Sequence, residues 1–190
     1  MVTHTNEILH KHETIICQDI VLRKYLESDI PALHALMSDS ETLRYLDWPA
    51  DTYTYQDAHD AIYNYFWASP GKWAIALATG GDTIGSIDLS LERLHDRAGF
   101  GYVLSREHWG KGYMAQALAA LIRLAFEQLE VNKIESMCYV GNEKSGRVME
   151  KCGMIHEGTK REHRLIRGQY MDAIMYGITR KMYLTDHPAV

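Results

Sequence analysis

The 190-residue chain lacks several features that would assign it to whole classes of protein. No apolar run approaches the roughly 18 residues that a membrane helix needs, so we expect no membrane partner. The first twelve residues are polar, and we expect no signal peptide there. The three cysteines, Cys17, Cys138 and Cys152, are odd in number and scattered, which argues against a disulfide framework and a metal site. These absences predict a cytoplasmic protein without a metal.

The charge balance argues against another class of partner. A net charge of −5 does not favour binding to nucleic acid. Apolar residues make up 46% of the chain and charged residues 24%, as in ordinary globular proteins. We therefore expect a flexible N-terminal tail over residues 1–14, a single domain over 15–183 and a C-terminal tail over 184–190.

Hydrophobic periodicity predicts a mixed α/β fold. The first half favours a strand over 15–24, a helix starting near Pro31, a second helix from about Tyr55 to Trp67, and a hairpin of strands 73–78 and 83–91. The second half favours a strand over 99–104, a long amphipathic helix from Tyr113 to about Glu130, a strand over 131–140, a short helix between Asn142 and Gly153, and strands over 154–167 and 170–182.

The most informative stretch is Trp109-Gly110-Lys111-Gly112-Tyr113-Met114-Ala115, which lies between a predicted strand and the long helix. Glycines let the backbone approach a ligand closely, and the N–H groups of a first helical turn point toward an anion. The helix dipole adds partial positive charge at the same place. We therefore expect a phosphate-bearing ligand at residues 107–115.

Two kinds of phosphate ligand fit such a turn. Gly110 to Ala115 match the dinucleotide pattern G-x-G-x-x-A, and Glu130 lies twenty residues past Gly110. That pattern normally follows the first strand of a βαβαβ unit directly, whereas here it lies past mid-chain, with Ser105–Trp109 between strand and glycine. The dinucleotide interpretation is the weaker of the two.

The second interpretation rests on more of the chain. Leu104–Ala117 resembles the acetyl-CoA pyrophosphate loop of the GNAT N-acetyltransferase superfamily, although Glu107 stands where that family often has Gln or Arg. Residues 142–154 resemble its N-x-x-S-x-R-hydrophobic-x-E-K-x-G-hydrophobic segment, and residues 168–172 resemble the end of its domain. The resemblance covers about residues 20–183 and is greatest to the ribosomal-protein N-terminal (alanine and serine) acetyltransferases.

The resemblance implies a fold and a cofactor site. The fold would be a central, mostly antiparallel twisted sheet with a splayed pair of central strands, flanked by helices. Acetyl-CoA would be the cosubstrate, with no metal. The residues expected to bind it are Tyr102, Val103, Leu104, Trp109, Gly110, Lys111, Gly112, Tyr113, Met114, Asn142 and Ser145.

Acetyl transfer to an amine requires a neutral amine and a proton for the departing thiolate. The resemblance makes Ser145 the first candidate for the general acid, with Tyr139 or Tyr102 as substitutes. Ser145 is equally well explained as a residue that satisfies backbone N–H groups in the first turn of its helix.

The general base is not identified by the sequence. Many relatives carry Glu at the position of Gly99, which cannot accept a proton. Asp88 is a weak candidate base, and Glu157 or a chain of waters are alternatives. A missing strong base favours an α-amine acceptor over Lys, because an α-amine loses its proton more readily. Trp48 and Tyr102 are the candidates for substrate binding.

We therefore expect an N-acetyltransferase that moves an acetyl group directly from acetyl-CoA to a primary amine, preferably a protein or peptide N-terminus. A small-molecule amine, such as a polyamine, amino acid or aminoglycoside, is the alternative acceptor. A non-catalytic acyl-CoA-binding protein is the alternative of another class. The protein would be a monomer or homodimer.

Overall fold

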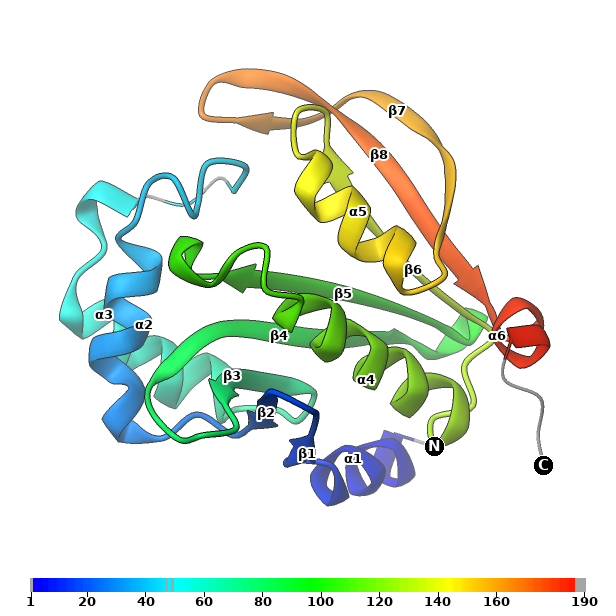
Figure 1. Ribbon diagram of the computed structural model, residues 1–190, viewed down its shortest axis with the longest axis horizontal. Coiled ribbons are helices and arrows are strands. Elements are labelled where there is room, and N and C mark those ends of the chain that lie inside the picture. Colours follow the sequence, from blue (N-terminus) through cyan, green and yellow to red (C-terminus); the bar gives the residue numbers. More distant parts are fainter. Residues whose placement is uncertain (1, 47, 49, 187–190) are drawn as a thin grey trace. The chain divides into compact units, whose positions relative to one another are not determined.

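The computed structural model describes residues 2–46, 48 and 50–186 (Figure 1). The helices are α1 (Val2–Lys11), α2 (Ile30–Met37), α3 (Tyr55–Ala61), α4 (Tyr113–Glu127), α5 (Glu143–Lys151) and α6 (Arg180–Asp186). The strands are β1 (Ile15–Ile16), β2 (Ile20–Arg23), β3 (Lys72–Leu77), β4 (Thr83–Glu92), β5 (Arg97–Leu104), β6 (Lys133–Tyr139), β7 (Ile155–Ile166) and β8 (Gln169–Thr179).

The chain divides into two compact units, which are described separately. The first comprises Met1–Asp88 and Tyr102–Ala117, and the second comprises Leu89–Gly101 and Leu118–Val190. Strands β4 and β5 and helix α4 each contribute residues to both units. The single domain expected over residues 15–183 stays a prediction.

In the first unit the strands follow the order β1-β2-β3-β4-β5. Residues 15–24, predicted as one strand, are instead two short antiparallel strands, with Ile15 opposite Leu22. The Cys17 N–H donates to the Ile20 carbonyl at 2.9 Å and closes the turn between them. The prediction of one strand was wrong because alternating apolar residues do not reveal a turn.

Within the predicted N-terminal tail, residues Val2–Lys11 form helix α1. Leu9 of α1 is buried, and the Trp73 indole Nε1 donates to the His12 carbonyl at 2.9 Å. The many histidines of this segment give it a polar composition, which hides the apolar contact that Leu9 makes.

Helices α2 and α3 lie side by side in the first unit (Figure 1). They pack over a core that α2, α3 and β3 share, made of Tyr25, Ile30, Leu33, Leu36, Tyr53, Ala58, Ile62 and Ala74. The helix predicted from Tyr55 to Trp67 is α3 followed by a π-helical turn, Ile62–Phe66, and Trp67 ends it. Such π-helical insertions are uncommon and occur frequently near functional sites.

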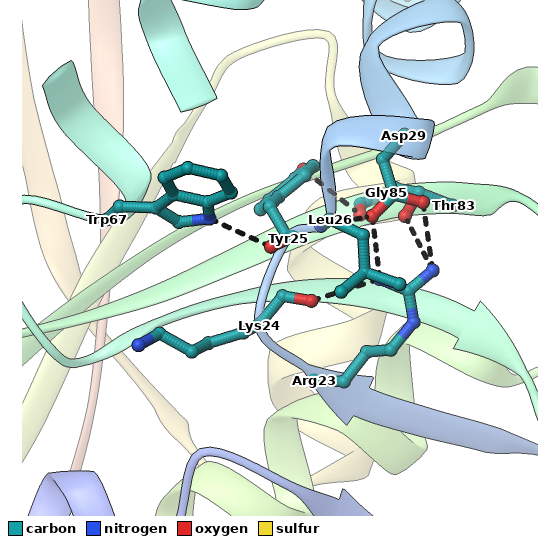
Figure 2. A network of polar contacts seen from close by, with 8 residues as sticks. All are labelled: Arg23, Lys24, Tyr25, Leu26, Asp29, Trp67, Thr83 and Gly85. Carbon is teal, nitrogen blue, oxygen red and sulfur yellow. Dashed lines mark hydrogen bonds and ion pairs between the residues drawn. The ribbon is translucent and has the colours of Figure 1, made fainter. Parts of the chain in front are cut away.

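An ion pair between the half-buried Arg23 and the buried Asp29 holds the start of α2 against the end of β2 (Figure 2). The Arg23 guanidinium donates to the Asp29 carboxylate at 2.6 and 2.9 Å, and the Leu26 N–H donates to the same carboxylate at 2.8 Å. Beside it, the Trp67 indole donates to the Tyr25 carbonyl at 2.8 Å. These contacts fix both ends of the α2–α3 segment relative to the strands of this unit.

In the second unit the strands follow the order β4-β5-β6-β8-β7. Strands β5 and β6 are parallel, and α4 is the helical connection that a parallel pair requires. Their register runs from Arg97 opposite Lys133 to Gly99 opposite Glu135, and the Ser136 hydroxyl then donates to the Phe100 carbonyl at 2.8 Å. A side chain therefore replaces the backbone ladder where the two strands begin to separate.

The remaining elements confirm the predicted fold class, a mixed α/β fold with a mostly antiparallel sheet and flanking helices. The predicted apolar stripe of the long helix is buried throughout at Met114, Ala117, Leu118, Leu121, Ile122, Ala125 and Leu129. The last predicted strand ends at Thr179, where α6 begins. The predicted C-terminal tail starts inside α6, and its residues 187–190 lie outside the described part of the chain.

Candidate active site

The glycine-containing turn predicted to cradle phosphate connects β5 to α4. Gly110 and Gly112 have φ values of +78° and +83°, in the left-handed region that favours glycine. A Cβ built on either glycine would meet no atom within 4 Å, so the space above the turn is open. The 15-residue helix α4 begins directly after it at Tyr113. This geometry fits the phosphate end of acetyl-CoA, because open backbone and a helix N-terminus coincide.

Side chains around the turn stiffen it and give it charge. The Trp109 indole Nε1 donates to the Leu104 carbonyl at 2.7 Å, which ties the turn back to the end of β5. Lys111, between the two glycines, is exposed, and so is Glu107. Burial and the Lys111 ammonium both lower the pKa of His108, so its imidazole is kept neutral beside the turn.

The end of β5 passes very close to β4 in the first unit. A Cβ on Gly85 would lie 2.5 Å from the Val103 carbonyl oxygen, so only glycine fits at that point. The Ser105 N–H donates to the Ile84 carbonyl at 2.9 Å. This close pairing holds Val103 and Leu104 in place, next to the half-buried Tyr102.

Asn142 and Ser145 open helix α5 in the second unit. Asn142 is the N-cap, and its side-chain oxygen accepts a hydrogen bond from the Ser145 N–H at 3.4 Å. Ser145 is half-buried in the first turn. Asn142 therefore has a structural role, and its amide NH₂ group is not used by the cap.

Asp88 lies at the end of the β4 segment that belongs to the first unit, opposite Lys72 of β3. Burial raises the pKa of Asp88 to about 6, while the Lys72 ammonium lowers it. Lys72 is itself held, because its Nζ donates to the Tyr65 carbonyl at 2.7 Å. A carboxyl group with this pKa is ionised at neutral pH and is a stronger base than an ordinary aspartate.

The other positions considered for the base lie in the second unit. The Glu157 carboxylate pairs with Lys133 Nζ at 2.8 Å, and a Cβ on Gly177 would come within 2.6 Å of it. Glu157 is therefore engaged in a packed ion pair. A Cβ on Gly99 would lie 3.1 Å from the Ser90 Oγ, whose hydroxyl donates to the Gly99 carbonyl. A glutamate at position 99 would require Ser90 to move.

Trp48, one of the two predicted substrate-binding residues, is 46% exposed. Its ring lies 6.3 Å from that of Tyr53, measured between centroids. Trp48 is thus the exposed end of a group of aromatic side chains.

The structure places the predicted residues in two groups. The turn, the end of β5, Asp88 and Trp48 belong to the first unit, and Asn142 and Ser145 belong to the second. The sequence analysis missed Lys72 as the partner of Asp88. The pairing of β3 with β4 places Lys72 opposite Asp88, and no local sequence motif predicts this pairing.

The described residues form no metal site, and two of the three cysteines are unreactive. No three His, Cys, Asp or Glu side chains among the described residues are grouped to hold a metal. Burial raises the pKa of the Cys152 thiol to about 11 and also raises that of Cys138, so both thiols stay protonated. Among the described residues, no helix is both long and apolar enough to cross a membrane.

Comparison with known proteins identifies the domain. The family described as an acetyltransferase (GNAT) domain matches residues 19–155. "Putative ribosomal N-acetyltransferase YdaF" of Bacillus subtilis (strain 168) is 31% identical over 134 residues, which cover 70% of this chain and 73% of that protein.

Two further relatives differ in their named acceptors. Spermidine N(1)-acetyltransferase of Escherichia coli (strain K12) is 25% identical over 169 residues, covering 88% of this chain and 90% of that protein. A solved structure of RimL, a ribosomal L7/L12 α-N-protein acetyltransferase in complex with coenzyme A, shares the fold with a TM-score of 0.77. It is 23% identical and covers 88% of this chain and 98% of that chain.

Proposed function

The chain belongs to the GNAT acetyltransferase family and is an acetyl-CoA-dependent N-acetyltransferase, and on that premise we propose that its preferred acceptor is a protein or peptide N-terminal α-amine. The observation that carries this choice is the basicity of Asp88. The acetyltransferase domain is taken as residues 15–183, within which the family match at 19–155 falls.

Proton transfer to Asp88 is less uphill from one kind of amine than from the other, because the amines themselves differ in pKa. Moving a proton from an α-amine, with a reference pKa of about 7.7–8.0, to a carboxylate of pKa about 6 is uphill by about 2 units, or about 3 kcal/mol. From a Lys amine, with a reference pKa of about 10.4, the same transfer is uphill by more than 4 units, or about 6 kcal/mol. Asp88 therefore supports acetylation of an α-amine better than that of a Lys side chain.

Cofactor binding and the two proton transfers are each assigned to residues of this chain. Acetyl-CoA supplies the acetyl group, and the turn at Gly110 and Gly112 holds its phosphates. Asp88 takes the proton of the acceptor amine, directly or through water. The amine nitrogen then attacks the thioester carbonyl carbon without a covalent enzyme intermediate. As the C–S bond breaks, Ser145 gives a proton to the sulfur and regains one from the nitrogen that has become bonded to the acetyl group.

A small-molecule amine is the second candidate acceptor. The similarity to a spermidine N(1)-acetyltransferase over 88% of this chain favours it. An aliphatic polyamine has amine pKa values nearer that of Lys, so Asp88 supports it less well.

The acceptor class is tested by thiol release from acetyl-CoA with three acceptors at equal concentration: a peptide with a free N-terminus and no Lys, the same peptide with a blocked N-terminus and one Lys, and spermidine. We expect the highest kcat/KM with the free N-terminus. A higher value for the blocked Lys peptide or for spermidine would contradict the proposed acceptor.

A further inference from the structure

The segment between Arg44 and Lys72 has an unusual composition. Residues 45–71 contain no Lys or Arg, four aspartates and eight aromatic residues, namely Tyr45, Trp48, Tyr53, Tyr55, Tyr63, Tyr65, Phe66 and Trp67. The chain as a whole has 20 basic and 25 acidic residues, so this absence of basic residues is local. We call residues 45–71 the aspartate–aromatic segment.

Part of this segment forms a row of rings with His34 of α2, which we call the aromatic row: Trp48, Tyr53, His34 and Tyr55. Ring centroids are 6.3 Å apart for Trp48 and Tyr53, 6.3 Å for Tyr53 and His34, and 5.1 Å for His34 and Tyr55. Tyr53 is buried, whereas Trp48 is 46% and Tyr55 52% exposed. The row therefore has a fixed centre and two large exposed rings.

Rings of the same segment already bind cations within the protein. The Lys72 ammonium lies 3.5 Å from the centroid of the Tyr65 ring, and the Arg44 guanidinium lies 5.7 Å from that of Tyr45. Both distances are within the range of cation–π attraction. The two cations that border the segment in sequence are thus seated on its rings, whereas the aromatic row presents its two exposed rings to solvent.

Carboxylates give the row a negative environment. Burial and the Asp57 carboxylate raise the pKa of Tyr53 to about 12. Asp51, in the turn just before Tyr53, is exposed, and so is Asp60 of α3, whose carboxylate lies 3.0 Å from the His59 imidazole. Arg44, the nearest basic residue in sequence, pairs with Glu41 at 3.7 Å. Charge complementarity therefore favours a cation on this surface.

The core that contains Tyr53 packs against Val103, at the end of β5 where acetyl-CoA is expected to bind. We propose that the aromatic row and its neighbouring aspartates bind the part of the acceptor beyond the reacting amine, and select acceptors that carry further positive charge. This inference rests on the acetyltransferase function proposed above. An ammonium or guanidinium group is attracted to the face of an aromatic ring, and the carboxylates attract the cation from a distance. A peptide with basic residues after its N-terminus and an aliphatic polyamine share this chemistry.

The substrates for the test differ only in charge. Three tetrapeptide amides have the sequences Ser-Ala-Arg-Arg, Ser-Ala-Gln-Gln and Ser-Ala-Glu-Glu, and arginine is used because its guanidinium is not an acetyl acceptor. Spermidine and hexylamine form a second, small-molecule pair. Both kcat/KM and equilibrium binding to the CoA-loaded protein are measured, at low and at high salt.

The variants test the contributions of the aromatic rings and of the carboxylates separately. Tyr55→Leu removes an exposed ring, and the double variant Asp51→Asn/Asp60→Asn removes two charges while keeping side-chain size. Asp82→Asn, on the exposed turn between β3 and β4, removes a like charge elsewhere and is the matched control.

We expect the arginine peptide to exceed the glutamate peptide in kcat/KM by about tenfold at low salt, and this ratio to shrink at high salt. Tyr55→Leu and the double aspartate variant should each reduce the ratio by about two- to fivefold, and Asp82→Asn should not change it. If the arginine peptide exceeds the glutamate peptide by a larger factor than spermidine exceeds hexylamine, the natural acceptor is a protein. If the larger factor is that of spermidine, the natural acceptor is a small polyamine.

Equal kcat/KM for the three peptides, together with equal values for spermidine and hexylamine, would overturn the inference while leaving the acetyltransferase function intact. Absence of thiol release with every acceptor would contradict the proposed function instead. In that case the inference is tested by equilibrium binding of the peptides to the CoA-loaded protein. Tighter binding of the arginine peptide, weakened in the double aspartate variant, supports the inference, and equal binding of the three peptides overturns it.

Discussion

Replacing Asp88 by asparagine should stabilise the protein and inactivate it at the same time. The pKa of Asp88 is about 6 in the folded protein, against 3.8 for an ordinary aspartate. A difference of about 2 units corresponds to about 3 kcal/mol. Because the folded pKa is raised, ionisation of Asp88 weakens the fold as the pH rises from about 4 to about 6, and the full cost remains above that range. Asparagine has no charge to bury, so Asp88→Asn avoids this cost.

The assay is urea unfolding at pH 4 and pH 7.5, with thiol release measured at pH 7.5. Asp88→Asn should raise the free energy of unfolding by about 1–3 kcal/mol at pH 7.5 and have a much smaller effect at pH 4, because Asp88 is then protonated in the folded protein and only about half ionised in the unfolded chain. Its kcat should fall by a factor of about 10² or more, as for loss of a general base. Asp82→Asn, on an exposed turn, should change neither quantity. A variant that is destabilised at pH 7.5, or that retains its kcat, would refute the role given to Asp88.

The other predictions concern the cradle, the acid and the ion pair between Arg23 and Asp29. Ser145→Ala should lower kcat by a factor of about 10² while leaving the Kd for CoA nearly unchanged, because Asn142 still caps α5; an unchanged kcat places the acid elsewhere. Gly112→Ala should weaken acetyl-CoA binding in a calorimetric titration, because φ is +83° there and a left-handed residue other than glycine costs about 1–2 kcal/mol. Asp29→Ala should lower the free energy of unfolding by about 3–5 kcal/mol, because Arg23 loses its buried partner; a loss below 1 kcal/mol would contradict this. Burial alone would raise the pKa of Asp29, but the Arg23 hydrogen bonds lower it overall, so this contribution is present above about pH 4 and is lost on acidification below it.

The sequence predicts well those features that a local pattern determines. The left-handed glycines of the turn follow from the spacing of Gly110 and Gly112, and the buried stripe of α4 follows from apolar residues three and four positions apart. Asn142 is recognisable as an N-cap because its side chain precedes an amphipathic helix. In each case neighbouring residues alone supply the physical reason.

Features that depend on distant contacts are not predicted. The helix α1 is stabilised where Leu9 is buried and where Trp73, more than sixty residues away, donates to the His12 carbonyl. The raised pKa of Asp88 comes from burial, and Lys72, across a strand pair, opposes it. The split of the predicted helix into α3 and a π-helical turn likewise leaves no signal in the periodicity of residues 55–67.

The central claim is that this protein binds acetyl-CoA at the turn before α4 and transfers its acetyl group to an amine. It is tested most directly by calorimetric titration of acetyl-CoA, with NADH as the control, followed in the same sample by thiol release on addition of a peptide with a free N-terminus. Binding of acetyl-CoA but not NADH, followed by release of one thiol for each peptide acetylated, is the predicted result. Binding of NADH in place of acetyl-CoA, or no binding of acetyl-CoA, would contradict the claim.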